Sequence, residues 1–186
     1  MTKIVKLLID AGHGGTDSGA VYDNAREKDF TLRFTLAVRN YLLTKYKVDI
    51  TLTRDSDKSL SLTQRTNLAN SLNVNYFVSI HINAGGGSGF ESYIYNGSVP
   101  SSTVTQQNII HQAIMSKIRY FGVIDRGKKR NDFQVLRETN MSAILLENLF
   151  IDTSRDLSLL RNSSFNAALV VGISEGIAQA LFLPKK

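Results

Sequence analysis

The sequence predicts an α/β domain with a mainly parallel central sheet. Three short apolar runs have the pattern of buried strands, at residues 3–9, 76–81 and 143–147. Between them, hydrophobic residues recur at the spacing of one helix face, as over residues 27–45. Strands that alternate with amphipathic helices are typical of βαβ units, whose strands run parallel. The 186 residues fit one domain, and no repeat or low-complexity segment divides them.

Local signals place the elements that follow the first helix. Residues 48–53 have the pattern of the next strand, and the hydroxyl of Ser61 can cap a helix over residues 62–72. The glycine-rich run at residues 85–89 predicts a mobile loop. A short strand is expected directly after it, over residues 90–95, because aromatic and apolar residues return there.

The second half continues with helices and short strands. Gly172 and Gly176 lie on the apolar face of the last helix, but Ser174 and Glu175 interrupt its apolar run. Close packing of this helix on the sheet is therefore favoured over a membrane dimerisation pair. The expected elements are a helix from Ser101 or Ser102 to about residue 119, a loop over 126–130, a strand over 133–137, a short helix from Asp152 or Thr153, and a last helix over 165–181.

The composition is that of a globular chain, with 42% hydrophobic and 20% charged residues. No cysteine is present, so a zinc site would need nitrogen and oxygen ligands. The N-terminus lacks the apolar core of a signal peptide, and no run approaches the roughly 18 apolar residues of a membrane span. We expect a protein made in the cytoplasm without a signal peptide and without a transmembrane segment, which would act outside only after release by other means.

The net charge of +6 favours an acidic partner, such as nucleic acid, anionic lipid or an anionic cell wall. Part of this excess lies in the basic run at residues 126–130, whose ordinary explanation is a solvated loop. No zinc finger, helix-turn-helix pattern or aromatic-rich strand motif accompanies it. We therefore expect no nucleic-acid partner.

Four side chains stand in settings unlike those of ordinary surface residues. His13 lies in a glycine-rich turn after the first strand pattern, His81 ends the second, and Glu147 ends the third. Glu27 opens the first helix. Sites in open parallel sheets form beyond the carboxyl ends of strands, where three of the four are expected. Two imidazoles and a carboxylate can hold a zinc ion and leave a position for water, whose proton a further carboxylate can accept.

Each of these side chains also has an ordinary structural explanation. His13 could be a histidine of a tight loop, and His81 a core histidine bonded to backbone. Glu27 could complement a helix N-terminus, where negative charge is favoured. Glu147 could form a structural ion pair, because burying an unpaired carboxylate costs several kcal/mol. The arginines considered as its partner are Arg65 and Arg137.

Other catalytic patterns are missing. The turn around His13 fits neither a dinucleotide fingerprint nor a P-loop with its lysine. The sequence has no G-x-S-x-G elbow, no H-E-x-x-H and no cysteine nucleophile. His111 lies among polar and apolar residues of the expected third helix, and we expect it at the surface. From the residues alone, the chain is expected to be a zinc hydrolase of α/β fold.

Several segments also match a known family, in the family's order along nearly the whole chain. The chain resembles the zinc-dependent N-acetylmuramoyl-L-alanine amidases, the cell-wall hydrolases of bacteria and phage lysins, especially those of sporulating bacilli that lyse the mother cell. The matching segments are residues 9–15, 27–29, 52–54, 79–83, 89–93, 125–129, 135–137 and 146–148.

The resemblance implies a fold, a substrate and a role for each candidate residue. The fold would be a mixed, mainly parallel six-stranded sheet flanked by helices. The substrate would be peptidoglycan, cut at the amide between N-acetylmuramic acid and L-alanine of the stem peptide. His13, Glu27 and His81 would bind one Zn²⁺, and Glu147 would be the catalytic carboxylate. We also assign Arg137, as a donor to the developing oxyanion, and Asn83 to substrate binding.

Two positions depart from the family pattern: Ser142 stands where proline is usual, and Leu149 where glycine is common, just after the expected strand. Residues 1–186 are expected to form a catalytic domain alone, without the wall-binding repeats that related enzymes often carry. Two other functions stay open, a wall-binding module without catalysis and a zinc peptidase acting on free peptides.

Overall fold

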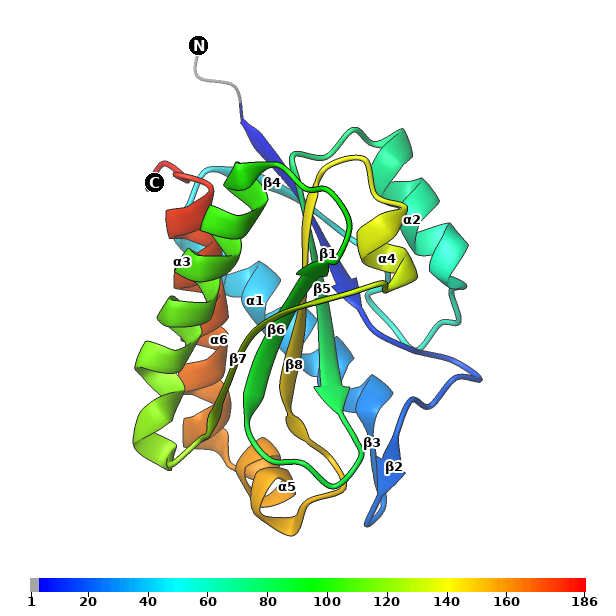
Figure 1. The fold of residues 1–186 in the computed structure, drawn as a ribbon, viewed down its shortest axis with the longest axis vertical. Helices are drawn as coiled ribbons and strands as arrows, with labels where there is room; N and C mark the ends of the chain where they lie inside the picture. Colours follow the sequence, from blue (N-terminus) through cyan, green and yellow to red (C-terminus); the bar gives the residue numbers. More distant parts are fainter. Residues whose placement is uncertain (1–3) are drawn as a thin grey trace.

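The computed structural model describes residues 4–186, so Lys3, the expected start of the first strand, lies outside the described residues. Six strands form one sheet in the order β4-β1-β5-β8-β6-β7 (Figure 1). A small separate sheet pairs β2 with β3. The bounds are β1 Val5–Ala11, β2 Val21–Tyr22, β3 Ala25–Arg26, β4 Val48–Leu52, β5 Tyr76–Asn83, β6 Phe90–Tyr95, β7 Asp125–Asn131 and β8 Ser142–Phe150.

The direction of the strands confirms the expected mixed, mainly parallel sheet. β1 runs parallel to both β4 and β5, and β5 runs parallel to β8. β6 is antiparallel to β8, and β7 is parallel to β6. The carboxyl ends of β1, β5 and β8 therefore share one edge region with the beginning of β6. Residues from four strands can meet there.

Helices cover both faces of the sheet (Figure 1). α1, α3 and α6 pack their apolar side chains on one face in a large core cluster, and α2 and α4 cover part of the other face over a smaller one. Among residues 4–186, no helix has the length and apolar character needed to cross a bilayer. The bounds are α1 Glu27–Lys45, α2 Leu62–Ser71, α3 Ser101–Ile118, the 3-10 turn η1 Arg119–Phe121, α4 Gln134–Arg137, α5 Ser154–Arg161 and α6 Ser163–Ala180.

Helix capping and packing follow local chemistry. The hydroxyl of Ser61 accepts a hydrogen bond from the backbone N–H of Gln64, and Gln64 Oε1 accepts one from the backbone N–H of Ser61. This reciprocal pair confirms the expected cap of α2. Gly172 and Gly176 lie against another helix rather than the sheet. A Cβ on them would meet Ile114 Cα at 2.9 Å and Ile110 Cα at 3.0 Å, respectively, so they allow close contact between α6 and α3.

Two expected elements were wrong. The basic run at residues 126–130 is part of the edge strand β7 instead of a loop. An edge strand needs no apolar alternation, and charged side chains protect its unpaired backbone. Residues 133–137 contain the short helix α4 instead of a strand. Val135 and Leu136 are adjacent and both buried, which one helical turn over the sheet allows and an alternating strand does not.

Strand β8 is longer than expected, and Leu149 lies inside it rather than after it. The pairing of β5 with β8 shifts register between His81 and Asn83, so β8 contains one additional residue there. Leu149 has φ 73° and is buried with 1% exposure. The backbone at this position is therefore left-handed, the conformation that glycine adopts without strain.

Candidate metal centre

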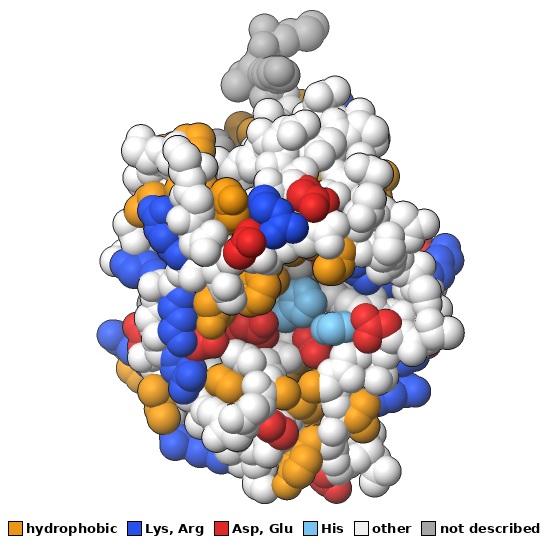
Figure 2. Space-filling model, turned by 45° about the vertical axis from the view of Figure 1, so that its right-hand side comes forward, with side chains coloured by type: hydrophobic (Ala, Val, Ile, Leu, Met, Phe, Trp, Pro, Cys, Tyr) orange, Lys and Arg blue, Asp and Glu red, His pale blue; other side chains and the backbone are white. Residues whose placement is uncertain are grey.

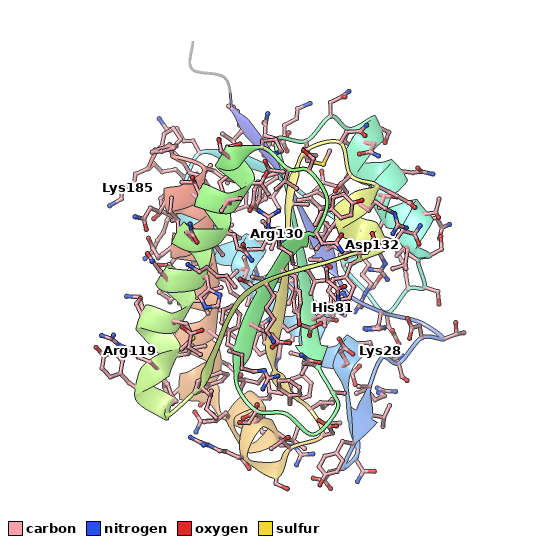
Figure 3. All side chains as sticks on the ribbon, in the orientation of Figure 1. Lys28, His81, Arg119, Arg130, Asp132 and Lys185 are labelled. Atoms are coloured by element: carbon pink, nitrogen blue, oxygen red, sulfur yellow. The ribbon has the colours of Figure 1, made fainter. Side chains whose placement is uncertain are left out.

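Three of the four candidate side chains meet at the carboxyl end of the sheet. Ligand atoms of His13, Glu27 and His81 all lie within 4.8 Å of one another. Figure 2 shows histidine rings in a hollow of the surface, with acidic side chains around them. In Figure 3, His81 is labelled toward the end of β5.

His13 has a left-handed backbone conformation, with φ 59°, in the turn after β1. Its Nδ1 lies 2.8 Å from Asp17 Oδ2, and its Nε2 lies 3.1 Å from Glu27 Oε2. Burial alone would lower the pKa of His13, but the carboxylates of Glu27 and Asp17 raise it to about 9. A carboxylate on one ring nitrogen fixes the ring and directs the other nitrogen toward the cluster.

Glu27 is the first residue of α1, and it is 4% exposed. Its Oε1 accepts a hydrogen bond from the backbone N–H of Ile82 and its Oε2 from that of Ala20, at 3.0 and 3.1 Å. Burial would raise its pKa, but the hydrogen bonds with His13 and His81 hold that pKa well below the usual range. The carboxylate is therefore ionised and fixed in direction.

His81 lies near the end of β5, with its Nδ1 3.0 Å from Glu27 Oε1. Its ring is edge-on to that of His13, with 5.0 Å between the centroids. The imidazole also lies against Gly12, where a Cβ would come within 2.4 Å of His81 Cε1. A glycine at position 12 is therefore needed for the ring to take this place.

Glu147 lies beside this cluster, because its Cα is the partner of His81 in the β5–β8 register. Its Oε2 is buried and has no hydrogen-bond partner within residues 4–186. Burial raises the pKa of Glu147 to about 7, against the lowering effect of the charge on His81. Such a carboxyl group can exchange a proton near neutrality.

The ion pair considered for Glu147 is not formed. Arg65 is buried and donates from Nη1 to Asp10 Oδ1 at 2.6 Å and from Nη2 to the carbonyl of His13 at 2.8 Å. Burial would raise the pKa of Asp10, but the charge of Arg65 holds it below the usual range. Arg54, also buried, donates to the carbonyl of Gly12 and to one in the first turn of α1. These two arginines hold the turn that carries His13.

Arg137 and Asn83, the residues assigned to substrate binding, lie in different settings. Arg137 pairs with Asp132 and Glu138 next to α4, where Figure 3 labels Asp132. Asn83 ends β5 and donates from Nδ2 to Glu91 Oε1 at 2.7 Å. Neither forms a hydrogen bond with the metal cluster in the described part of the chain, and their assignment stays a prediction.

The expectation that His111 lies at the surface was wrong. It is 3% exposed, its Nδ1 lies 2.8 Å from Ser92 Oγ, and its Nε2 lies 2.8 Å from Asp125 Oδ1. The buried positions of α3 recur every three or four residues and include His111. That helical spacing was the signal that could have placed it in the interior.

The sequence patterns did not single out Glu91. Its Cα is the partner of Glu147 across the antiparallel pair of β6 with β8. It is 2% exposed and forms ion pairs with Arg126 and Lys129 of β7. The one sequence feature that could have pointed to Glu91 is its place between Phe90 and Ser92, in a segment that matches the family.

Comparisons with known proteins agree with this geometry. An N-acetylmuramoyl-L-alanine amidase of Bacillus licheniformis, CwlM, is 48% identical over 183 residues, which are 98% of this chain and 71% of that protein. The endolysin of Bacillus phage SPP1 is 47% identical, over 100% of this chain and 69% of the endolysin. The sporulation-specific N-acetylmuramoyl-L-alanine amidase of Bacillus subtilis is 46% identical, over 98% of this chain and 70% of that protein.

Solved structures give the same result. The catalytic domain of CwlV, an N-acetylmuramoyl-L-alanine amidase from Bacillus (Paenibacillus) polymyxa var. colistinus, superimposes with a TM-score of 0.89 at 34% identity, over 97% of this chain and 99% of that one. Residues 7–179 match the family described as N-acetylmuramoyl-L-alanine amidase. With its sheet, its helices and its cluster at the carboxyl edge, this chain belongs to the N-acetylmuramoyl-L-alanine amidase family.

Proposed function

We propose that this amidase depends on one zinc ion held by His13, Glu27 and His81, and that it cuts the amide between N-acetylmuramic acid and L-alanine in peptidoglycan. One observation carries the proposal: two imidazoles and an ionised carboxylate converge beside a buried carboxyl group, that of Glu147, whose Oε2 has no partner among the described residues. Catalytic zinc sites commonly use three such protein ligands and keep a position open.

The donor set fits zinc rather than magnesium or calcium. The ligands offer two ring nitrogens and carboxylate oxygen, and no thiolate is available in the chain. Sites for magnesium or calcium use oxygen ligands almost exclusively. The contact between His13 and Asp17 is the carboxylate–histidine arrangement that orients ligands in zinc sites.

Zinc would supply a Lewis acid that polarises the scissile carbonyl and acidifies water. The residues of the chain supply the proton transfer. Glu147 accepts a proton from the attacking water and donates it to the departing amine nitrogen. Burial raises its pKa to about 7 in the metal-free protein, and the charge of a bound zinc ion would lower it; these opposed effects suit a group that takes up and releases a proton. Glu27 and the two histidines stay in place through both steps.

The test combines metal analysis with product identification. We expect Glu147→Gln to retain about one zinc per chain and to lose hydrolysis by a factor of about 10² to 10⁴. We expect His13→Ala to lose zinc and activity together. Glu175→Gln, the same substitution on α6, where the carboxylate binds Tyr41 and Tyr46, is the control and should keep both.

Purified cell walls are the substrate, with and without a chelator. Mass spectrometry of the released fragments should show free L-alanine amino termini that vanish with the chelator. Release of fragments cut elsewhere in the peptide would indicate a peptidase, and binding to walls without any release would indicate a wall-binding module. Zinc loss in Glu147→Gln would make that residue a ligand. We further propose that the protein meets its substrate only after release from the cytoplasm.

A further inference from the structure

A buried carboxylate next to the catalytic edge holds a cluster of polar side chains in place. Glu91 lies on β6, and its side chain is 3% exposed. It accepts hydrogen bonds from Asn83 Nδ2 at 2.7 Å, Tyr93 Oη at 2.8 Å and Arg126 Nε at 2.7 Å. Lys129 Nζ donates to the same carboxylate. Glu91 therefore fixes side chains from three strands at one point.

Arg126 uses only part of its hydrogen-bonding capacity in this cluster. Its Nε donates to Glu91, and its guanidinium lies over the ring of Phe150, with Cζ 4.8 Å from the ring centroid. Neither terminal nitrogen, Nη1 or Nη2, has a hydrogen-bond partner within residues 4–186, and the side chain is 33% exposed. The guanidinium is thus oriented before any ligand arrives, and it presents its two-nitrogen edge, the geometry that binds a carboxylate with two parallel hydrogen bonds.

The charge of the cluster favours an anionic ligand. Burial would raise the pKa of Glu91, but the hydrogen bonds from Lys129, Arg126 and Tyr93 outweigh it and lower that pKa. Glu91 is therefore ionised and balances one of the two cations beside it. The remaining positive charge lies on β7, the strand next to that of Glu91. Figure 2 shows lysine and arginine side chains along one side of the hollow that contains the histidine rings.

The distance from the reacting bond can be deduced from the sheet. Glu91 is the cross-strand partner of Glu147, and β7 is the next strand beyond β6 (Figure 1). Neighbouring strands lie about 4.8 Å apart, so the backbone of Arg126 lies roughly 10 Å from that of Glu147. An extended peptide covers about 3.3–3.6 Å per residue, so the second residue after a cut amide lies about 7 Å from it, within reach of a long arginine side chain.

We propose that Arg126 binds a carboxylate of the stem peptide, on the second residue after the scissile amide, and that it determines specificity for that carboxylate. This inference rests on the proposed function. The glycan side offers no free carboxylate, because the lactyl carboxyl group of the muramic acid is consumed in the scissile amide. A carboxylate near the reacting bond must therefore come from the peptide.

Protection of the sheet edge alone does not explain this arrangement. Lys128 is exposed on the same strand, and its register partner, Ser92, lies on β6 between Glu91 and Tyr93. The register shift before Lys128 adds one residue to β7, and Ser92 alternates with Glu91 and Tyr93, so Lys128 faces away from the cluster that holds Arg126. It protects the edge without being held by a buried carboxylate. Lys128→Met is therefore a matched control for Arg126→Met, because it lies on the same strand and also removes one positive charge.

The experiment compares two synthetic disaccharide tetrapeptides that contain no phosphate. Both have γ-linked D-glutamate as the second residue, with its α-carboxylate free in one and converted to a carboxamide in the other. kcat and KM are measured for the zinc-loaded wild type, Arg126→Met, Arg126→Lys and Lys128→Met, after thermal unfolding has shown that each variant folds.

We expect the wild type and Lys128→Met to prefer the carboxylate probe by about tenfold or more in kcat/KM, the range of a charged hydrogen-bonded pair. Arg126→Met should abolish this preference through KM and leave the carboxamide probe nearly unaffected. Arg126→Lys, which keeps the charge but not the two-nitrogen edge, should fall between them. Equal wild-type rates on both probes, or an equal loss on both in Arg126→Met, would overturn the inference and leave the proposed function standing. No cut at the muramoyl–alanine amide in either probe would contradict both.

Discussion

Glu147 lies directly opposite His81 in the parallel pairing of β8 with β5. Both side chains point to the sheet face covered in part by α2 and α4, because they lie an even number of residues after Phe77 and Leu145, which pack in the cluster on that face. His81 has Glu27 as its carboxylate partner, whereas Oε2 of Glu147 has no partner among the described residues. Two carboxyl groups near the same imidazole therefore have opposite properties: Glu27 has a pKa well below its usual range, and Glu147 has one of about 7.

The raised pKa of Glu147 predicts how the stability of the metal-free protein depends on pH. Below the unfolded pKa of 4.5, Glu147 is neutral in both the folded and the unfolded protein. As the pH rises from there through about 7, the unfolded protein releases this proton more readily than the folded one, so the folded state loses stability. Glu147→Gln has no charge to bury, so its free energy of unfolding relative to the wild type should rise between pH 5 and pH 8, by up to about 3 kcal/mol. Urea unfolding in the presence of a chelator at both pH values measures this.

The control for this measurement is Glu175→Gln. The hydrogen bonds from Tyr41 and Tyr46 lower the pKa of Glu175, so its contribution to stability is present above its unfolded pKa and is lost as the pH falls. Between pH 5 and pH 8 that contribution is almost complete, so the stability of Glu175→Gln relative to the wild type should stay nearly constant there, in contrast to that of Glu147→Gln. A Glu147→Gln curve parallel to that of the wild type would show that Glu147 is not buried as described.

The close contact of Gly12 with the His81 ring predicts that adding one methyl group at position 12 weakens metal binding. A Cβ there would lie 2.4 Å from Cε1 and 2.6 Å from Nε2 of His81, closer than atoms can approach, so the imidazole must move. We expect Gly12→Ala to weaken zinc binding about tenfold or more, because ligand geometry must hold within about 0.5 Å. Competition with a chromogenic chelator measures this affinity.

Gly86→Ala is the comparison for this variant. Gly86 has φ 74° and no atom within 4 Å of an added Cβ, so alanine there should lose a little stability through backbone strain and keep its zinc affinity. Equal affinities in Gly12→Ala and the wild type would mean that His81 is not a ligand or that the turn shifts freely. Such a shift is opposed by Arg54 and Arg65, which bind the carbonyls of this turn.

The sequence patterns located the strands that carry the site but not the contacts that orient it. Apolar runs and the glycine-rich turn indicated where His13, His81 and Glu147 lie, and because parallel strands have their carboxyl ends at one edge, these residues were expected at the same edge. The positions of Glu91 and of Arg126 depend on the pairing of β6 and β7. The sequence pattern located β6 but not its antiparallel direction, and the charged edge strand β7 has no hydrophobic period.

Leu149 shows a second limit, because a side chain can be selected for packing against the preference of its own backbone. It is 1% exposed in the large core cluster, yet its φ is 73° in the irregular part of β8. For a residue with a Cβ, this conformation costs roughly 1–2 kcal/mol, whereas truncating a buried leucine to alanine costs about 2–5 kcal/mol. Burial therefore outweighs strain, and leucine should be the most stable of the three residues leucine, glycine and alanine at this position.

The order of the two smaller residues tests the backbone directly. At other positions inside helices and strands, a protein with glycine is less stable than the same protein with alanine by about 0.5–1 kcal/mol. At position 149 we expect the reverse, with Leu149→Gly more stable than Leu149→Ala by about 1 kcal/mol, since both lose the packing of the side chain and only alanine keeps the strain. The comparison uses Leu157, which is buried in α5 with 2% exposure; there Leu157→Ala should be more stable than Leu157→Gly. Urea unfolding of the four variants decides the matter: an alanine variant more stable than the glycine variant at both positions would show that β8 has no left-handed residue beside Glu147.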